Sequence, residues 1–488
     1  MDGSRGVALT ALLERVGAAQ ISGDPQLVVT EIAIDSGSVR PGAIFVALRG
    51  SHTDGHRFVR EAVENGARAV VVERMQDDLP SNVTVVRVGD SRRALSALAA
   101  AFYGDPSRRL DVIGVTGTNG KTTAVHMIAA ILEAAEIPCG VLGTVGAEFG
   151  RLRRSVENTT PLPPALHELL AEMRDAGAKA VAMEVSSHAL ALDRVDDVRF
   201  RAAVLTNVAR DHLDFHETIE AYAAAKRRLF AMAPASVLNV DDEFGARWAR
   251  ELERDGRKIV SYGTGSGATL VPSGISLTSD ATAFTVNGQR YELSLPGRFN
   301  VLNALAAIGV GRLFEIDPTI VARGLAGVEH VPGRMERITG GDVVVIVDYA
   351  HTPDALENAL RSLRETVGGR LAVVFGCGGD RDRGKRSEMG AIAARMADRI
   401  YVTSDNPRSE SPQAIADAVL AGVGAADHVV ELDRRRAIER AIAEARAGDI
   451  VLVAGKGHET YQIIGDRITP FDDAAVARAA LAARAVLR

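Results

Sequence analysis

The chain has 488 residues, of which 47% are hydrophobic and 25% charged, and its formal net charge is −6. This length is too great for a single hydrophobic core, so we expect roughly three domains. The acidic charge balance argues against nucleic acid or an anionic membrane as a partner, and no apolar run approaches the length of a membrane span. The two cysteines form neither a disulfide framework nor a metal-ligand motif. We therefore expect a cytoplasmic, monomeric enzyme or switch that acts on small molecules.

Residues 1–106 are predicted to form a small α/β domain. It contains the short apolar strands "GAIFVAL", "ARAVVVE" and "VTVVRVG", and it ends in an Ala-rich helix over residues 91–103. The stretch "YGDPSRR" that follows is typical of a linker.

Residues 107–331 and 332–488 are predicted to form two further α/β domains. The first has the buried-type strands "LDVIGVTG", "AKAVAMEV" and "FRAAVLTNV", and its Gly-, Ser- and Thr-rich residues 263–296 indicate a small antiparallel sheet. The second alternates strands such as "DVVVIVDYA", "RLAVVFGCG" and "DIVLVAG" with helical patterns. This predicts a central P-loop-type ATPase domain with a mostly parallel sheet, followed by a Rossmann-like doubly wound sheet with helices on both faces.

Seven polar clusters each follow directly on a predicted strand. They are "TGTNGKTT", "EVSSH", "TNVARDH", "DYAHTPD", "GGDRDRGKR", "SDNPR" and "GKGHE". Ligands of open α/β sheets bind at the carboxyl ends of the strands. One site between two domains is therefore predicted.

The stretch "GVTGTNGKTT", residues 114–123, is predicted to bind phosphate. The backbone N–H groups of Gly117, Thr118, Asn119 and Gly120 can surround phosphates at a helix N-terminus. Lys121 then reaches the terminal phosphates, and Thr122 or Thr123 ligates Mg²⁺. A Gly-rich turn without a ligand is the alternative, because Val115 replaces the first glycine of the usual motif. A GTP-dependent switch is disfavoured, since the sequence has no Asn-Lys pair to read guanine.

Glu184 and His212 are candidates for a metal site, and Lys226 is singled out as a lysine in a chain rich in arginine. Glu184 ends an apolar strand, where a carboxylate needs a partner or a metal. His212 has a satisfied structural histidine as its alternative, and Lys226 a solvated lysine. Lys226 is one of only six lysines, in a chain where arginine supplies most of the positive charge.

The C-terminal clusters indicate a nucleotide contact and a zwitterion site. Asp348 and His351 can hold a ribose or base, although an N-cap followed by Pro353 explains the same residues. Guanidinium and carboxylate groups, including Arg408 and Glu459, suit a substrate with both carboxylates and an amine.

Taken together, these motifs resemble the Mur ligases, the ATP-dependent amide-forming enzymes of peptidoglycan synthesis, whose relatives include folylpolyglutamate synthetase. The similarity runs in order from about residue 30 to 465 and also includes "ENTTP". It implies an N-terminal domain for a UDP-muramoyl dipeptide, a central ATPase and a C-terminal domain that presents an amino acid, here meso-diaminopimelate. It also implies that Lys226 is carbamylated and bridges Mg²⁺ ions, and that Glu184 and His212 are further ligands of the metal.

The resemblance assigns the remaining site residues one by one. ATP contacts are implied for Asn303 and Arg334, in addition to Asp348 and His351. The uridine end is implied at Ser36, Ser51, His52 and Thr53, and the muramoyl dipeptide at Asn158, Thr159, Thr160, Ser186 and Arg194. The diaminopimelate site is implied at Arg381, Asp405, Asn406, Pro407, Arg408, Gly455 and Glu459.

Two positions depart from the family pattern. Gly37 follows Asp35-Ser36 where the family usually has Arg, and Leu192 replaces a common Gln. The alternatives are a sister ligase that adds L-lysine, a ligase that adds glutamate to a folate, and a binding module that has lost its chemistry. The presence of Lys121, Glu184 and Lys226 argues against the last of these.

Overall fold

The computed structural model describes residues 6–18, 20–50, 53–76, 79–278, 281–340 and 342–486. The chain divides into two units. The first consists of Met1–Thr116, Ile137–Ala203 and Ala224–Ala235, and the second of Gly117–Glu136, Val204–Ala223 and Ser236–Arg488. Within the described ranges, no helix is both long and apolar enough to cross a membrane.

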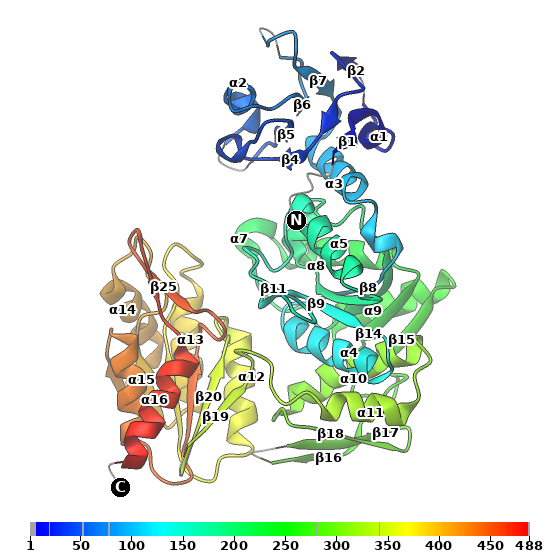
Figure 1. Cartoon of the computed structure of the whole chain (residues 1–488). Helices are drawn as coiled ribbons and strands as arrows, with labels where there is room; N and C mark the ends of the chain where they lie inside the picture. Colours follow the sequence, from blue (N-terminus) through cyan, green and yellow to red (C-terminus); the bar gives the residue numbers. More distant parts are fainter. Residues whose placement is uncertain are drawn as a thin grey trace. The chain divides into compact units, whose positions relative to one another are not determined.

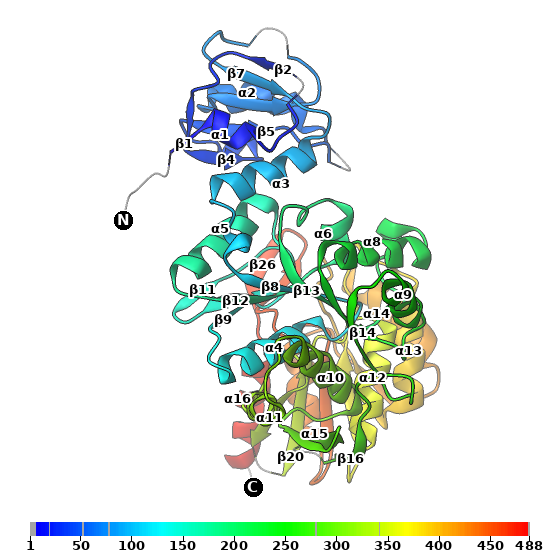
Figure 2. The same cartoon turned by 90° about the vertical axis from the view of Figure 1, so that its right-hand side faces the viewer.

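The N-terminal residues form a five-stranded sheet with helices on both faces (Figure 2). Its strand order is β2 (Gln20–Ser22), β7 (Thr84–Arg87), β6 (Ala69–Val72), β5 (Ala43–Val46) and β4 (Glu31–Ala33), parallel except for β2. Side chains of β5 and β6 alternate between α1 (Leu9–Leu13) with α3 (Ser91–Phe102) on one face and α2 (Val59–Glu64) on the other. Burial on both faces explains the continuous apolar runs, and the predicted strands and final helix are confirmed. Short elements complete this part: β1 (Val7–Ala8), β3 (Val28–Val29), η1 (Ser36–Ser38) and η2 (Gly55–Phe58).

Residues 111–262 contain the strands of a central eight-stranded sheet. Its strand order is β11 (Leu152–Arg154), β10 (Gly146–Phe149), β9 (Cys139–Gly143), β12 (Ala180–Glu184), β8 (Asp111–Thr116), β13 (Phe200–Leu205), β14 (Ala235–Asn239) and β15 (Lys258–Tyr262). Strands β9, β12 and β8 are parallel, whereas β10 and β11 form an antiparallel extension. The helices of this region are η3 (Pro106–Arg108), α4 (Lys121–Ala134), α5 (Pro163–Asp175), α6 (Ser187–Ala191), α7 (Leu213–His216), α8 (Ile219–Met232), α9 (Glu243–Arg254), α10 (Arg298–Leu313) and α11 (Pro318–Ala326). The predicted antiparallel patch is confirmed as β16 (Ser273–Leu277), β17 (Thr282–Val286) and β18 (Gln289–Leu293).

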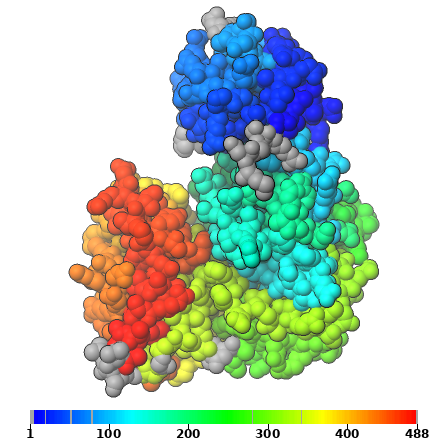
Figure 3. All heavy atoms as spheres, in the orientation of Figure 1, coloured from blue at the N-terminus to red at the C-terminus, as the bar shows by residue number. Residues whose placement is uncertain are grey.

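The C-terminal sheet is doubly wound, as predicted (Figure 1). Its order is β19 (Glu336–Gly340), β20 (Val343–Asp348), β24 (Ile450–Ala454), β21 (Leu371–Phe375), β22 (Arg399–Val402) and β23 (His428–Val430), and only β19 is antiparallel. Helices α12 (Pro353–Arg364), α13 (Lys385–Met396) and α14 (Pro412–Val423) cover one face, while α15 (Arg434–Glu444) and α16 (Asp473–Val486) cover the other. Figure 3 shows the red C-terminal residues, which include those of α16, on the face turned towards the viewer. A hairpin of β25 (Tyr461–Ile464) and β26 (Arg467–Pro470) precedes α16.

One buried side chain in the first unit is poorly satisfied. His167 of α5 is fully buried, and neither of its ring nitrogens has a hydrogen-bond partner among the described residues. Burial lowers the pKa of His167 to about 4, with Asp105 opposing the shift and Arg15 adding to it. In the unfolded chain the imidazole takes up a proton near pH 6.5, whereas in the folded chain it does so only near pH 4. The free energy of unfolding therefore falls as the pH is lowered from about 6.5 to 4, by about 3 kcal/mol in total.

We therefore expect His167→Leu to raise the free energy of unfolding by about 1 kcal/mol or more at pH 7.5, because it removes two unpartnered nitrogens. The gain should grow at pH 5, since the leucine takes up no proton. Urea unfolding at both pH values measures this, with His428→Leu at an exposed position as the control. If His167→Leu and wild type lost stability in parallel between the two pH values, the histidine would not be the group responsible.

Candidate active site

The predicted phosphate loop is a tight turn between β8 and α4. Gly120 has φ of 85°, and a Cβ there would lie 2.3 Å from the Asn303 Oδ1 atom, so only glycine fits. The Lys121 ammonium donates to the carbonyls of Gly117 and Thr118, both at 2.9 Å. Lys121 thus holds the loop closed from inside, and Asn303 packs directly against it.

The loop is held from outside by the segment that follows β13. Asn119 N–H donates to the Asn207 side chain at 2.9 Å, and the Thr206 hydroxyl donates to the Asn119 carbonyl at 2.5 Å. The Asn119 side chain also donates to Asp354 of α12 at 2.6 Å. Thr206 and Asn207 belong to the predicted "TNVARDH" cluster and Asp354 to "DYAHTPD", so three of the seven polar clusters meet in the second unit.

Arg334 connects the first turn of α4 with an aromatic cluster. Its Nη2 donates to the Thr122 hydroxyl at 2.9 Å, and its guanidinium lies 4.8 Å from the centre of the Tyr349 ring. The His351 and His458 rings lie 4.5 Å and 5.0 Å from that of Tyr349. Burial, together with the positive charge of Arg334, lowers the pKa of His458 to about 4, so its imidazole is neutral at pH 7. A flat, cationic and aromatic surface of this kind is suited to a nucleobase or ribose.

Asp348 is held by the backbone. Its two carboxylate oxygens accept from the N–H groups of Met335 and Ala350, each at 2.8 Å. Burial raises the pKa of Asp348 while Arg334 opposes the rise. The Thr352 hydroxyl accepts from Ala355 N–H and caps α12, with Pro353 at its first position. The N-cap interpretation of "DYAHTPD" is therefore confirmed, and a nucleotide contact of Asp348 or His351 stays a prediction.

Glu184 is a buried carboxylate of the first unit. Only 1% of Glu184 is exposed, and its carboxylate accepts from Thr144 N–H at 2.8 Å and from the Thr144 hydroxyl at 3.1 Å. A Cβ at Gly143 would lie 2.2 Å from the Glu184 Oε1 atom, so glycine is required there. Each oxygen thus has a second lone pair that these two bonds do not use. The sequence reasoning missed Thr144, although "GT" directly after strand β9 was the available signal.

The predicted dipeptide contacts gather around Glu184. Thr160 donates to the Glu184 carbonyl at 2.9 Å, Arg194 donates to the Thr160 carbonyl at 3.0 Å, and the Ser186 hydroxyl caps α6. Thr159 lies 3.1 Å from the Thr144 hydroxyl. Asn158 instead lines a cavity of about 430 Å³.

The residues predicted to bind Mg²⁺ are Glu184, His212 and Lys226, together with Thr122 and Thr123 of the phosphate loop. Within the described ranges, no three His, Cys, Asp or Glu side chains gather closely enough to hold a metal ion. Lys226 is 1% exposed on α8, in the same unit as Glu184. His212 belongs to the second unit, and its imidazole, 45% exposed, lies 3.4 Å from Asp211. Burial would raise the pKa of Asp211, but His212, His351 and Lys121 outweigh it and lower the pKa.

The loops at the carboxyl ends of β22 and β24 are joined by a buried polar network. The Lys456 ammonium, fully buried, donates to Asn406 Oδ1 at 3.0 Å and to Glu459 Oε2 at 3.1 Å. The Asn406 amide also donates to Glu459 at 2.9 Å. Gly455 has φ of 117°, and a Cβ there would lie 2.6 Å from Asp405 Oδ2. The structure thus brings Asp405, Asn406, Gly455 and Glu459 together, as predicted.

Arg408 lies at the junction of three segments. Its backbone φ is 51°, and its N–H donates to Ile463 of the hairpin at 3.2 Å. Its Nη1 donates to the Gly379 carbonyl at 2.9 Å. A Cβ at Gly379 would lie 1.8 Å from the Pro407 carbonyl oxygen, so the Gly-Gly bend allows this contact. Arg381, in the same loop as Gly379, is exposed and donates to the Asp380 carbonyl.

Two of the four residues predicted to contact uridine, Ser36 and Thr53, are among the described residues. Ser36 is 8% exposed at the start of η1, and its carbonyl accepts from Asn65 at 2.9 Å. Thr53 is exposed, and its backbone carbonyl accepts a hydrogen bond from Gly50 N–H at 2.8 Å. Ser51 and His52 lie outside the described residues. A uridine contact stays a prediction.

Three family matches cover the chain in order. Residues 28–103 match the catalytic domain of the Mur ligase family, residues 115–311 the Mur ligase middle domain, and residues 333–457 the glutamate ligase domain of Mur ligases.

Curated relatives match over nearly the full length. The UDP-N-acetylmuramoyl-L-alanyl-D-glutamate–2,6-diaminopimelate ligase of Chlorobaculum tepidum is 46% identical over 94% of this chain and 92% of its own. The enzyme of the same name from Geobacillus thermodenitrificans is 44% identical over 98% and 99%. A solved structure of a ligase of that name is 33% identical, with a TM-score of 0.69 over 98% and 99%. The MurF ligase of Thermotoga maritima in complex with ADP shares the fold at 22% identity, with a TM-score of 0.63 over 93% and 96%.

Proposed function

The chain belongs to the Mur ligase family, and from this premise we propose that it adds meso-2,6-diaminopimelate to UDP-N-acetylmuramoyl-L-alanyl-D-glutamate in an ATP-dependent step of peptidoglycan precursor synthesis. The near-full-length identity of 40–46% with relatives named for this addition carries the proposal. The loops at the carboxyl ends of β8, β12, β22 and β24 support it, because each holds residues of the motifs that the reaction needs.

The proposed reaction has two steps: transfer of a phosphoryl group from ATP to a carboxylate, and then transfer of the activated acyl group to an amine. A carboxylate does not react with an amine at neutral pH, so an oxygen of the D-glutamate carboxylate first attacks the γ-phosphorus of ATP, which gives an acyl phosphate and ADP. The neutral amine of diaminopimelate then attacks the acyl carbon. The tetrahedral intermediate loses a proton and expels phosphate, and the amide remains. The protein contributes positioning and charge stabilisation.

Lys121 and the phosphate loop are proposed to hold the ATP phosphates. The loop has a lysine at its helix start and backbone N–H groups at the N-terminus of a 14-residue helix. In the structure the ammonium of Lys121 binds two carbonyls of the loop itself. We propose that it exchanges them for phosphate oxygens, because an ammonium gains more from a charged partner than from a neutral one.

Mg²⁺ fits the oxygen donors of this chain. Thr122 offers a hydroxyl, Glu184 a carboxylate with free lone pairs, and Lys226, once carbamylated, two further oxygens. We propose Glu184 and Lys226, which lie in the same unit, as ligands of the ion, and the assignments of Thr122, Thr123 and His212 stay predictions from the family resemblance. When bound, the ion neutralises charge on the phosphate oxygens. Thr144 positions the Glu184 carboxylate for this purpose through two hydrogen bonds.

Arg334 is proposed to bind the nucleotide. We expect Arg334→Ala to raise the KM for ATP about tenfold or more, because a charged hydrogen bond is worth roughly 1.5–3 kcal/mol. The KM values for the dipeptide and the amine should stay near wild type. Steady-state kinetics with each substrate varied in turn measures this, with the exposed Arg312→Ala on α10 as control. Equal rises in all three KM values would indicate general disruption instead.

The proposed function is tested by product analysis. The enzyme is incubated with ATP, Mg²⁺, the UDP-muramoyl dipeptide and single amines: meso-diaminopimelate, L-lysine and L-glutamate. We expect ADP, phosphate and a product heavier by one diaminopimelate residue, formed in equal amounts. ATP hydrolysis without amide formation, or an amide with L-lysine alone, would contradict the proposal. The domain boundaries at 106/107 and 331/332, the monomeric state and the cytoplasmic location stay predictions.

A further inference from the structure

A fully buried ion pair lies beneath the carboxyl ends of β22 and β24. Arg434, the first residue of α15, meets Asp473, the first residue of α16, and both side chains are 0% exposed. The pairing is bidentate, with Nε–Oδ1 at 2.8 Å and Nη2–Oδ2 at 2.6 Å. Neither residue belongs to a motif singled out from the sequence.

The guanidinium also binds the backbone at the start of both substrate loops. Its Nη2 donates to the Ala454 carbonyl at 3.0 Å and its Nη1 to the Ser404 carbonyl at 3.4 Å. Ser404 directly precedes Asp405–Arg408, and Ala454 directly precedes Gly455–Glu459. One side chain therefore connects the beginnings of the two loops that hold most of the predicted amino-acid contacts.

The charge of Arg434 acts on the same two loops. Burial disfavours its charged form, but Asp473, Asp405 and Glu459 outweigh this effect and raise the pKa of Arg434. Stability alone does not explain such a pair, because well-packed apolar residues in place of a buried ion pair are often neutral or stabilising. An arginine is suited to this place because its planar fork can bind a carboxylate and two carbonyls at once.

On the basis of the proposed function, we propose that Arg434 is a positioning residue for the amine substrate. Anchored by Asp473, it fixes residues 404–408 and 455–459 relative to each other, so that Arg408 and Glu459 are spaced to receive opposite ends of the zwitterion. Arg434 is buried and acts through the loops without touching the substrate.

The test is a variant that keeps stability and removes the connection. In Arg434→Met/Asp473→Leu the buried charges are replaced by apolar groups of similar size, so we expect the melting temperature to stay near or above that of wild type. The KM for the amine should rise about tenfold to a hundredfold, because small displacements of a binding group have effects of that size. The KM values for ATP and the dipeptide should stay close to wild type. Hydrogen exchange should quicken at residues 404–408 and 455–459.

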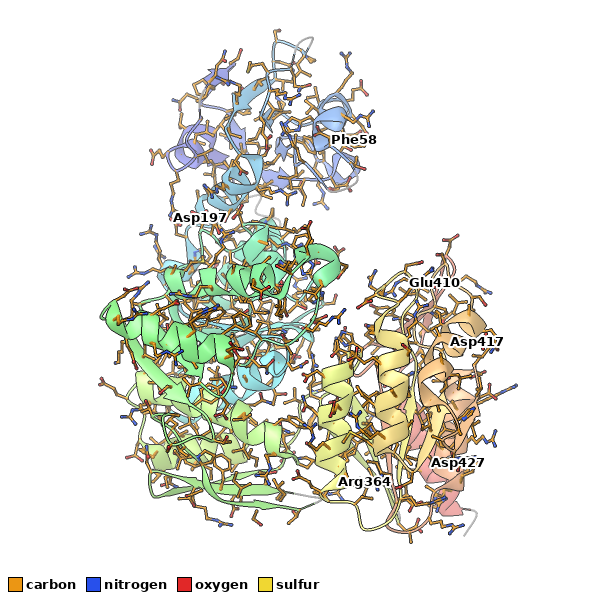
Figure 4. All side chains as sticks on the ribbon, turned by 180° about the vertical axis from the view of Figure 1, so that it is seen from behind. Phe58, Asp197, Arg364, Glu410, Asp417 and Asp427 are labelled. Carbon is orange, nitrogen blue, oxygen red and sulfur yellow. The ribbon has the colours of Figure 1, made fainter. Side chains whose placement is uncertain are left out.

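The control removes an ion pair from the opposite end of the same sheet. Arg364 donates to Asp398 at 2.8 Å where β22 begins, and Figure 4 shows Arg364 far from Glu410, which follows the Arg408 loop. Arg364→Met should leave the amine KM and the exchange of both loops unchanged.

Each outcome decides the role of Arg434. An unchanged amine KM, unchanged loop exchange, or equal rises in all three KM values in a folded double variant would overturn the proposal. If the double variant does not fold, Arg434→Lys is read in the same way, since it keeps the charge and loses the fork. Failure of wild type to use diaminopimelate would instead refute the proposed function, and the hydrogen-exchange comparison needs no substrate.

Discussion

Lys226→Arg should lose most of the ligase activity while the protein stays folded. Lys226 is almost completely buried on α8, and CO₂ adds only to a lysine in its neutral amine form. A carbamate turns a cation into a two-oxygen anion suited to Mg²⁺, and arginine keeps the positive charge but forms no carbamate. Loss of this anionic Mg²⁺ ligand should weaken the stabilisation of charge on the transferring phosphoryl group and lower kcat about a hundredfold or more.

Two measurements separate this effect from a folding defect. The exposed Lys179→Arg in the same unit is the matched control and should retain wild-type kcat. Wild type in ¹³C-bicarbonate should show a carbamate carbon signal by NMR, which Lys226→Arg lacks, and added bicarbonate should not restore activity. An unmodified Lys226 in active, Mg²⁺-loaded enzyme would refute the assignment.

Arg408→Ala should abolish the preference for meso-diaminopimelate over L-lysine. The two amines differ by one carboxylate on the distal carbon, and a cation is needed to hold it. Among the described residues, the hydrogen bonds of the Arg408 guanidinium use Nη1, to Gly379 and Asn406, so Nε and Nη2 remain to bind a carboxylate. A charged hydrogen bond contributes roughly 1.5–3 kcal/mol, and leaving a buried guanidinium without its partner costs more. We therefore expect wild type to prefer meso-diaminopimelate by about a hundredfold.

The readout is kcat/KM for both amines in wild type and variant. The variant should lose the preference mainly through a higher KM for diaminopimelate, and the exposed Arg436→Ala serves as control. If wild type used L-lysine equally well, or if Arg408→Ala left the ratio unchanged, the assignment of this substrate would fail.

The elements were predictable where local pattern determines structure. Strands such as β5, β6 and β24 are buried on both faces and therefore appear as apolar runs, and the polar clusters follow them at the sheet edge. Because parallel strands present their carboxyl ends to one edge, Asn406 and Glu459 could be expected to meet, although 53 residues separate them.

The supporting contacts were not predictable from pattern. Thr144 and Glu184 are 40 residues apart in the sequence, and Arg434 and Asp473 are 39 apart. Neither pair belongs to a motif with a fixed spacing. The roles of Gly143, Gly379 and Gly455 depend on atoms of distant segments, which would lie between 1.8 and 2.6 Å from an added Cβ. Such close approaches follow from how the loops pack and have no signature within one loop.

The contact between Lys456 and Glu459 has a consequence for the attacking amine. Glu459 already neutralises an ammonium of the chain itself before any substrate arrives. A second ammonium brought to the same carboxylate is repelled by Lys456, and repulsion between like charges favours the deprotonated form of the newcomer. Only that form carries the lone pair that attacks an acyl phosphate. We therefore expect the Lys456–Glu459 pair to favour the deprotonated, nucleophilic form of an amine that binds beside it.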